Sequence, residues 1–300
     1  INNMKKYLLL TCFLTSCSLE LSDEKDSWDK GSISNENAIS IEHDGLNREY
    51  VLHVPSSYNG NSPVPLVFNF HGGSGTATGQ RYLSEMDKVA DTAGFIVAYP
   101  QGSILFDGSS YWDSMIATES SKGTADDIGF ISILIDTISS NYNIDLEKVY
   151  ACGYSNGGDL SISLACYLSD KISAVAPVSG LMSLESDSLC QPQESTGVFL
   201  INGTADNSRP YNGINDYYLS VENALEFWSN HHRSDSTVIE NFMDNSNNSI
   251  EHFEYFNLND QSYLEHYKVI NGGHDWFELS VNDKNIDQVI WQFFSNISDN

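Results

Sequence analysis

The chain has 300 residues, of which 40% are hydrophobic. That length and composition suffice for one large core and are typical of a single α/β domain. The 41 acidic residues outnumber the 14 basic ones, so the formal net charge is −27 at pH 7. Such an excess of negative charge repels phosphate backbones, so we expect no nucleic acid partner and interpret the charge as a solvated acidic surface.

The first residues resemble an export signal. A positive segment, Met4-Lys5-Lys6, precedes an apolar run from Tyr7 to Leu14 that is too short to span a membrane as a helix. Leu14-Thr-Ser-Cys17 then resembles the lipobox of bacterial lipoproteins, which implies cleavage before Cys17 and lipidation of its thiol. The alternative is an ordinary signal peptide with an incidental cysteine.

We therefore expect a signal over residues 1–17, a flexible polar tether over 18–38 and a catalytic domain over 39–300. The mature protein would be exported, as a lipoprotein at the periplasmic or outer cell surface or as a secreted protein. It would contact a membrane only through the lipid on Cys17, and we expect a monomer.

From residue 39 onward, strand and helix patterns alternate. The expected strands are short: 48–54, 66–70, 95–99, 149–152, 174–178, 198–202 and 266–270. Residues 66–70 are almost continuously apolar, as in a strand covered on both faces. The expected helices are 80–93, with Gly94 as its stop, then 128–140, 159–168, 221–230 and 285–296. This β-α alternation predicts one α/β domain with a mostly parallel central sheet and helices on both faces.

Two segments depart from the alternation. Residues 102–124 form a long Ser/Gly-rich loop, which is where open α/β sheets bind ligands. Residues 236–263 are rich in Asn and Asp, and 251–256 alternate like an edge strand, so we expect a surface hairpin there and assign it no role. The gap 179–197 is too short for a lid domain.

Gly153-Tyr-Ser155-Asn-Gly157 lies between an expected strand and an expected helix. This G-x-S-x-G pattern in a strand-turn-helix context is typical of a nucleophile elbow, where glycines let the neighbouring backbone pass close to an exposed serine Oγ. Without that context it would be only a Gly/Ser-rich loop. Ser155 is therefore the predicted nucleophile.

A nucleophilic serine needs a base and an acid, which follow it in the order Ser, acid, His. Asp206 follows a buried strand and a glycine turn, and His274 lies on the glycine-rich turn after the last expected strand. Asp216 and Asp275 compete as the acid, and a local turn hydrogen bond is the plainer explanation of Asp206. We predict the triad Ser155–Asp206–His274 and expect the other seven histidines to be solvated or structural.

The oxyanion hole should combine two backbone N–H groups. One is that of Asn156, the residue after the nucleophile, and the other comes from the loop Phe70-His-Gly-Gly-Ser-Gly75, with Gly73 the first choice and Ser74 the second. His71 is expected to brace this loop. Cys152, Cys166 and Cys190 show no metal-ligand spacing, and Cys190 could pair with either of the others; no metal or cofactor is required.

Six motifs occur in order along the chain: Phe70-His-Gly-Gly, Tyr99-Pro-Gln-Gly, Asp126-Asp-Ile-Gly-Phe, Val149-Tyr-Ala-Cys-Gly-Tyr-Ser-Asn-Gly-Gly158, Gly203-Thr-Ala-Asp and Asn271-Gly-Gly-His-Asp-Trp. Together they resemble the polyhydroxybutyrate depolymerase and feruloyl esterase family of α/β-hydrolases (LpqC-type esterases). The resemblance spans about residues 48–295. It implies an α/β-hydrolase fold without a lid and an exported serine ester hydrolase.

The resemblance also implies roles for single residues. Trp112 and Trp276 would lie beside the acyl group, although either could be a core aromatic, and Asp127 would brace a loop, with helix capping as the alternative. The family often has a cysteine after the helix that ends here near Arg233. Its absence leaves Cys190 without that partner and argues against a disulfide.

The ester substrate implied by the resemblance is an acylated oligosaccharide or a hydroxyalkanoate oligomer. We favour cleavage of feruloyl or acetyl esters on plant polysaccharide over depolymerisation of 3-hydroxybutyrate oligomers. A serine peptidase and a non-catalytic surface-binding lipoprotein on the same fold are the other hypotheses.

Overall fold

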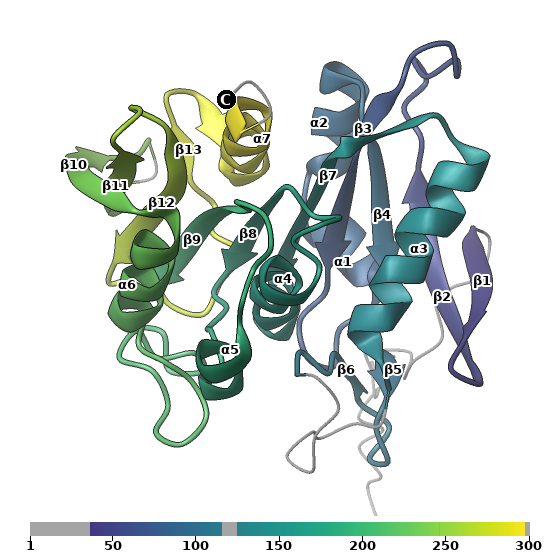
Figure 1. The fold of residues 1–300 in the computed structure, drawn as a ribbon, viewed down its shortest axis with the longest axis horizontal. Coiled ribbons are helices and arrows are strands. Elements are labelled where there is room, and N and C mark those ends of the chain that lie inside the picture. The colour runs from purple at the N-terminus through teal and green to yellow at the C-terminus, as the bar shows by residue number, and fades with distance from the viewer. Residues whose placement is uncertain (1–36, 116–124, 246, 298–300) are drawn as a thin grey trace, which may run out of the picture.

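A ten-stranded sheet runs through the molecule (Figure 1). The computed structural model describes residues 37–115, 125–245 and 247–297, so the predicted signal, Cys17 and nearly all of the predicted tether lie outside this part. In spatial order the strands are β1 (Ala38–His43), β2 (Leu46–His53), β4 (Ile96–Pro100), β3 (Val64–Phe70), β7 (Ile144–Tyr154), β8 (Ala174–Val178), β9 (Gly197–Gly203), β12 (Ser262–Ile270), β11 (Ser249–Asn257) and β10 (Ser234–Met243).

The six central strands, from β4 to β12, pair in parallel, and antiparallel strands extend the sheet at both ends. Helices cover both faces. The helices α3 (Asp127–Asn141), α4 (Asn156–Tyr167) and α6 (Val221–His232) pack on one face, and α1 (Ala77–Leu83), α2 (Met86–Ala93) and α7 (Ile286–Ile297) on the other. The predicted mostly parallel sheet with helices on both faces is confirmed.

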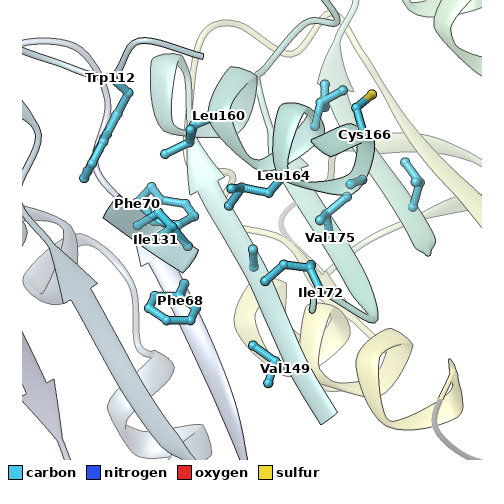
Figure 2. Close-up of a cluster of buried hydrophobic side chains, with 14 of the residues drawn as sticks. Phe68, Phe70, Trp112, Ile131, Val149, Leu160, Leu164, Cys166, Ile172 and Val175 are labelled. Atoms are coloured by element: carbon cyan, nitrogen blue, oxygen red, sulfur yellow. The ribbon is translucent and has the colours of Figure 1, made fainter. Parts of the chain in front are cut away.

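Successive side chains of a strand point to opposite faces, and this alternation divides the core in two. On β3, Phe68 and Phe70 enter the cluster beneath α3 and α4, whereas Val67 enters the cluster beneath α1, α2 and α7. Figure 2 shows the first cluster, in which Leu160 and Leu164 of α4 pack against the strands. Because both faces of the central strands are covered, their sequences are apolar throughout and do not alternate.

The predicted helix over 80–93 is two helices. Helix α1 ends at Leu83, and Ser84 is extended, with φ −91° and ψ 154°. The amide of Asn69 on β3 donates to the Ser84 hydroxyl at 3.0 Å, and the Glu85 backbone N–H donates to Asp287 of α7 at 3.2 Å. These partners lie far away in the sequence, so local periodicity could not reveal the break. Helix α2 ends at Gly94, with φ 82°, as predicted.

The segment expected to be a surface hairpin is part of the main sheet. Its strands β10 and β11 continue the sheet beyond β12, and β11 lies between β10 and β12. The predicted hairpin is present as β10 and β11, but residues 251–256 are not an edge strand, because β10 occupies the edge. Nearly all side chains of β11 are only half-buried, on both faces of the sheet. The strand therefore carries polar residues among its apolar ones, and this mixed sequence resembled that of an edge strand.

Cys166 and Cys190 form a disulfide, so the prediction against one is wrong. Helix α4 ends at Tyr167, and the short helix α5 (Leu184–Leu189) ends next to it, which brings the two Cα atoms to 4.9 Å. The resemblance implied a partner cysteine after the helix that ends near Arg233. The actual partner of Cys190 is Cys166 on α4, so the disulfide joins α4 to the segment that follows β8. Cys152 is buried and free, as expected for a small core residue.

We expect Cys190→Ser to lower the free energy of unfolding by about 3 kcal/mol, because the disulfide closes a loop with a sequence separation of 24 residues. Denaturant titration without reductant measures the difference. Wild type in reductant should lose the same amount, and reductant should not change Cys190→Ser. Equal stability of variant and wild type would contradict the prediction.

The residues that the structure describes include no helix both long enough and apolar enough to cross a membrane. Between β8 and β9, the described chain forms only α5 and its flanking turns. Two small hairpins lie outside the main sheet: β5 (Ser103–Ile104) with β6 (Ser110–Tyr111), and β13 (Ser280–Val281) with β14 (Lys284–Asn285).

Candidate active site

Ser155 occupies a strained turn between β7 and α4. Its φ of 54° and ψ of −115° lie where side chains with a Cβ rarely reside, at a cost of order 1–3 kcal/mol. The turn is tight because backbone passes close on both sides. A Cβ on Gly153 would lie 2.3 Å from the Gly157 oxygen, and one on Gly157 would lie 2.5 Å from the Phe70 oxygen. The G-x-S-x-G pattern thus forms a nucleophile elbow.

The structure brings the three predicted triad residues together. His274 Nε2 lies 2.9 Å from Ser155 Oγ, and His274 Nδ1 lies 2.7 Å from Asp206 Oδ2. The Asp206 carboxylate can only accept, so the proton of the neutral imidazole sits on Nδ1. Nε2 is then free to accept the hydroxyl proton of Ser155. This is the arrangement that a general base for a serine nucleophile requires.

A second set of hydrogen bonds holds the acid. Asp206 Oδ1 accepts from the backbone N–H groups of Ser208 and Arg209, each at 2.7 Å, so the local turn bond and the bond to His274 coexist on one carboxylate. The Arg209 guanidinium donates to Asp159 in the first turn of α4, with Nη2 2.7 Å from Oδ2. Asp159 also accepts from the backbone of Leu181 at 2.9 Å. Arg209 therefore joins the loop that holds Asp206 to helix α4, which follows Ser155.

Two backbone N–H groups are available beside Ser155. Among the described residues, the N–H groups of Gly73 and Asn156 have no hydrogen-bond partner, whereas Ser74 N–H donates to the Ser110 oxygen at 2.8 Å. Ser74, the second choice for the oxyanion hole, is therefore occupied. The glycine loop lies against the elbow, since a Cβ on Gly73 would be 3.9 Å from Asn156 Cβ. The N-terminus of α4 adds its positive dipole end at the same place.

Trp112 is fully buried, which favours the alternative of a core aromatic over a place beside the acyl group. Its indole N–H donates to the His71 oxygen at 2.9 Å, and its backbone N–H and oxygen pair with the Asn156 side chain at 2.7 and 3.0 Å. Trp112 therefore joins the oxyanion loop to the residue after the nucleophile. Trp276 is 7% exposed and packs in the core cluster beneath α7, which favours the alternative of a core aromatic.

His71 braces the oxyanion loop, as predicted. Gly102 N–H donates to His71 Nε2 at 2.9 Å, so Nε2 is unprotonated and Nδ1 donates to the Gly72 oxygen at 2.7 Å. Burial, and more weakly the nearby Arg48 charge, lower the pKa of His71 to about 4. The imidazole is neutral near pH 7, and its protonation would remove the acceptor for Gly102.

The depressed pKa of His71 predicts a loss of stability in acid. The unfolded chain binds a proton at this residue below pH 6.5 and the folded chain only below about 4, so its contribution is complete above 6.5 and lost as pH falls toward 4. The total is about 3 kcal/mol by linkage. The asparagine of His71→Asn cannot titrate. Between pH 6.5 and 4 the free energy of unfolding of this variant should therefore fall by about 3 kcal/mol less than that of the wild type. Parallel curves for the two proteins would contradict this.

Asp127 braces the loop that carries Trp112. Its carboxylate pairs with Arg48 at 2.5 Å and accepts from the Asp113 backbone N–H at 2.6 Å, while Asp126 caps α3. Burial raises the pKa of Asp127 to about 6, against the opposing effects of the Arg48 charge and the Asp113 N–H. The brace is thus favoured over capping.

Motif reasoning missed the connecting residues of the site. Arg209 and Asp159 belong to no catalytic motif, yet their ion pair joins the loop of Asp206 to helix α4. A signal was available, because a chain with 14 cations has one placed three residues after the predicted acid. The pairing of the Asn156 side chain with Trp112 had no such signal.

The sequence matches the Esterase PHB depolymerase family over residues 48–216, more than half of the chain. This span contains Ser155 and Asp206 but not His274. A bifunctional acetylxylan esterase/xylanase from Neocallimastix patriciarum is 26% identical over 251 residues, which cover 84% of this chain and 33% of that protein. Feruloyl esterase B from Piromyces equi is 31% identical over 168 residues, covering 55% of this chain and 30% of that protein. The matched region is thus about a third of each relative.

Among solved structures, an acetyl xylan esterase from Aspergillus awamori superposes with a TM-score of 0.62 at 15% identity, covering 87% of this chain and 99% of that one. At this identity the likeness shows the fold alone. It confirms the predicted α/β-hydrolase fold.

Proposed function

The chain belongs to the PHB depolymerase esterase family, and on that basis we propose that it is an exported serine carboxylic ester hydrolase acting through an acyl-enzyme. The observation that carries the proposal is the pair of hydrogen bonds from His274, one to Ser155 Oγ at 2.9 Å and one to Asp206 at 2.7 Å. A histidine between a serine hydroxyl and a buried carboxylate is the machinery of acyl transfer.

The proposed reaction has two halves. His274 Nε2 takes the hydroxyl proton as Ser155 Oγ attacks the ester carbonyl, and the Gly73 and Asn156 N–H groups stabilise the oxyanion. Asp206 holds the Nδ1–H tautomer and stabilises the imidazolium. The alcohol leaves with the proton from His274. Water then attacks the acyl-enzyme while His274 takes its proton, and His274 returns that proton to Ser155 Oγ as the carboxylic acid leaves. The residues named require no metal or cofactor.

For the substrate, we propose feruloyl or acetyl esters on plant polysaccharide fragments. The relatives named above act, by their names, on feruloyl or acetylxylan esters. The site supports a bulky alcohol group, because the described chain between β8 and β9 contains only α5 and no lid. The alternative is a 3-hydroxybutyrate oligomer, as the family name suggests. A peptidase or a non-catalytic binding protein is favoured by no specific observation.

Release of ferulate, acetate and 3-hydroxybutyrate from matched oligomeric substrates tests the proposal, with wild type and Ser155→Ala assayed in parallel. We expect ferulate or acetate release by wild type and none above background by the variant. Release of 3-hydroxybutyrate alone would select the alternative substrate. Cleavage of peptide amides but of no ester would overturn the proposal.

A further inference from the structure

A histidine and two glutamates lie together on the face of the sheet covered by α7, outside the catalytic residues. His252 and Glu254 are on β11, and Glu265 is on β12. One ligand atom from each lies within 4.8 Å of the other two, and His252 Nε2 is 2.9 Å from Glu265 Oε2. We propose that these three side chains bind a divalent cation, with Zn²⁺ the ion that fits best.

The register of the sheet places these ligands. Glu254 is directly opposite Glu265 in the antiparallel pair of β11 and β12, and Glu240 of β10 is directly opposite His252. Two like charges directly opposite one another destabilise a strand pair. A divalent cation between the carboxylates would convert this repulsion into attraction.

The site has both the burial and the room for an ion. The side chains of His252 and Glu265 are 13% and 14% exposed. Together with Glu254 they line a cavity of about 600 Å³, which is bounded by β10–β12, the β13–β14 hairpin and α7. These elements lie in the upper left part of Figure 1.

The donor atoms favour zinc over calcium or magnesium. One imidazole nitrogen with two carboxylate oxygens suits Zn²⁺, whereas Ca²⁺ and Mg²⁺ prefer oxygen ligands alone. Three protein ligands leave one position of a tetrahedral ion for water. The bond between His252 and Glu265 would give way to two metal bonds.

The ion would join β11 to β12, and β12 ends four residues before His274. Its effect would be to stabilise the part of the sheet that carries the catalytic histidine. The sequence did not suggest this site, because its ligands are alternate residues on neighbouring strands and lack a recognised metal-ligand spacing. The inference does not depend on the proposed function.

Thermal unfolding of chelator-treated protein with and without ZnCl₂ tests the proposal, together with calorimetric titration of ZnCl₂. We expect one Zn²⁺ per chain and a rise in Tm of about 5 °C at a hundredfold excess over Kd. His252→Gln and Glu254→Gln should abolish the rise. Without zinc, Glu254→Gln should be at least as stable as wild type, because the repulsion by Glu265 is removed.

Two matched variants make the result specific. Glu251→Gln changes the opposite face of β11, where Glu251 pairs with Lys268, and should keep the rise. His274→Ala should also keep it, which shows that zinc is not acting at the triad. The proposal is overturned if wild type shows no stoichiometric binding, if the rise survives in both His252→Gln and Glu254→Gln, or if Ca²⁺ gives an equal rise.

Discussion

Ser155→Ala is expected to lower kcat for ester hydrolysis by about 10⁴- to 10⁶-fold, with KM changed only a few-fold. In the proposed mechanism the hydroxyl is the nucleophile, and among the described residues Ser155 Oγ is the side-chain group that bonds to His274 Nε2, at 2.9 Å. The remaining rate would come from the oxyanion donors and from substrate binding alone. Steady-state kinetics on a p-nitrophenyl acyl ester measures the loss.

Ser155→Gly serves as the matched variant. It should be equally inactive, but it relieves the positive φ of 54° at the elbow, so its free energy of unfolding should exceed that of Ser155→Ala by about 1 kcal/mol. Inactivity of both with this difference in stability separates loss of the nucleophile from loss of the fold. More than 1% residual activity in either variant would contradict the assignment.

Asp206→Asn is expected to lower kcat by about 10⁴-fold without unfolding the protein. An amide NH₂ directed at His274 Nδ1 favours the tautomer with the proton on Nε2, and that tautomer cannot accept the Ser155 proton. The amide oxygen can still accept from the Ser208 and Arg209 N–H groups, so the local turn should persist. Steady-state kinetics measures the loss of kcat, and circular dichroism checks that the variant remains folded.

Asp275→Asn is the control for the acid. Asp275 is adjacent to His274 and was a competing candidate, but its side chain is exposed and His274 bonds to Asp206. Its kcat should stay within a few-fold of wild type. A larger loss in Asp275→Asn than in Asp206→Asn would reverse the assignment.

The parts of the fold predicted from the sequence are those with strong local signals. The central strands are apolar throughout because both of their faces are covered, so residues 66–70, 174–178 and 198–202 stood out. Strand β10 is exposed along nearly all of its length and has no such signal. The break between α1 and α2 depends on Asn69 and Asp287, which no local pattern includes.

The same distinction applies to the site. Ser155, Asp206 and His274 each follow a strand in a recognisable turn, so the sequence identified them, and the structure brings them within hydrogen-bond distance. What the motifs lacked was contact information. The sequence left open whether Trp112 lies beside the acyl group or in the core, and its hydrogen bonds to His71 and Asn156 accompany its burial in the core. The Cys166–Cys190 bond likewise depends on where α5 ends in space.

Reaction with a fluorophosphonate, followed by intact-mass and peptide mass spectrometry, tests the central claim most directly, because the reagent adds only to an activated serine. We predict one adduct per chain, on the peptide that contains Ser155, absent in Ser155→Ala and formed far more slowly in His274→Ala. An unlabelled wild-type protein, or an adduct on another residue, would contradict the claim that Ser155, His274 and Asp206 form a working catalytic triad.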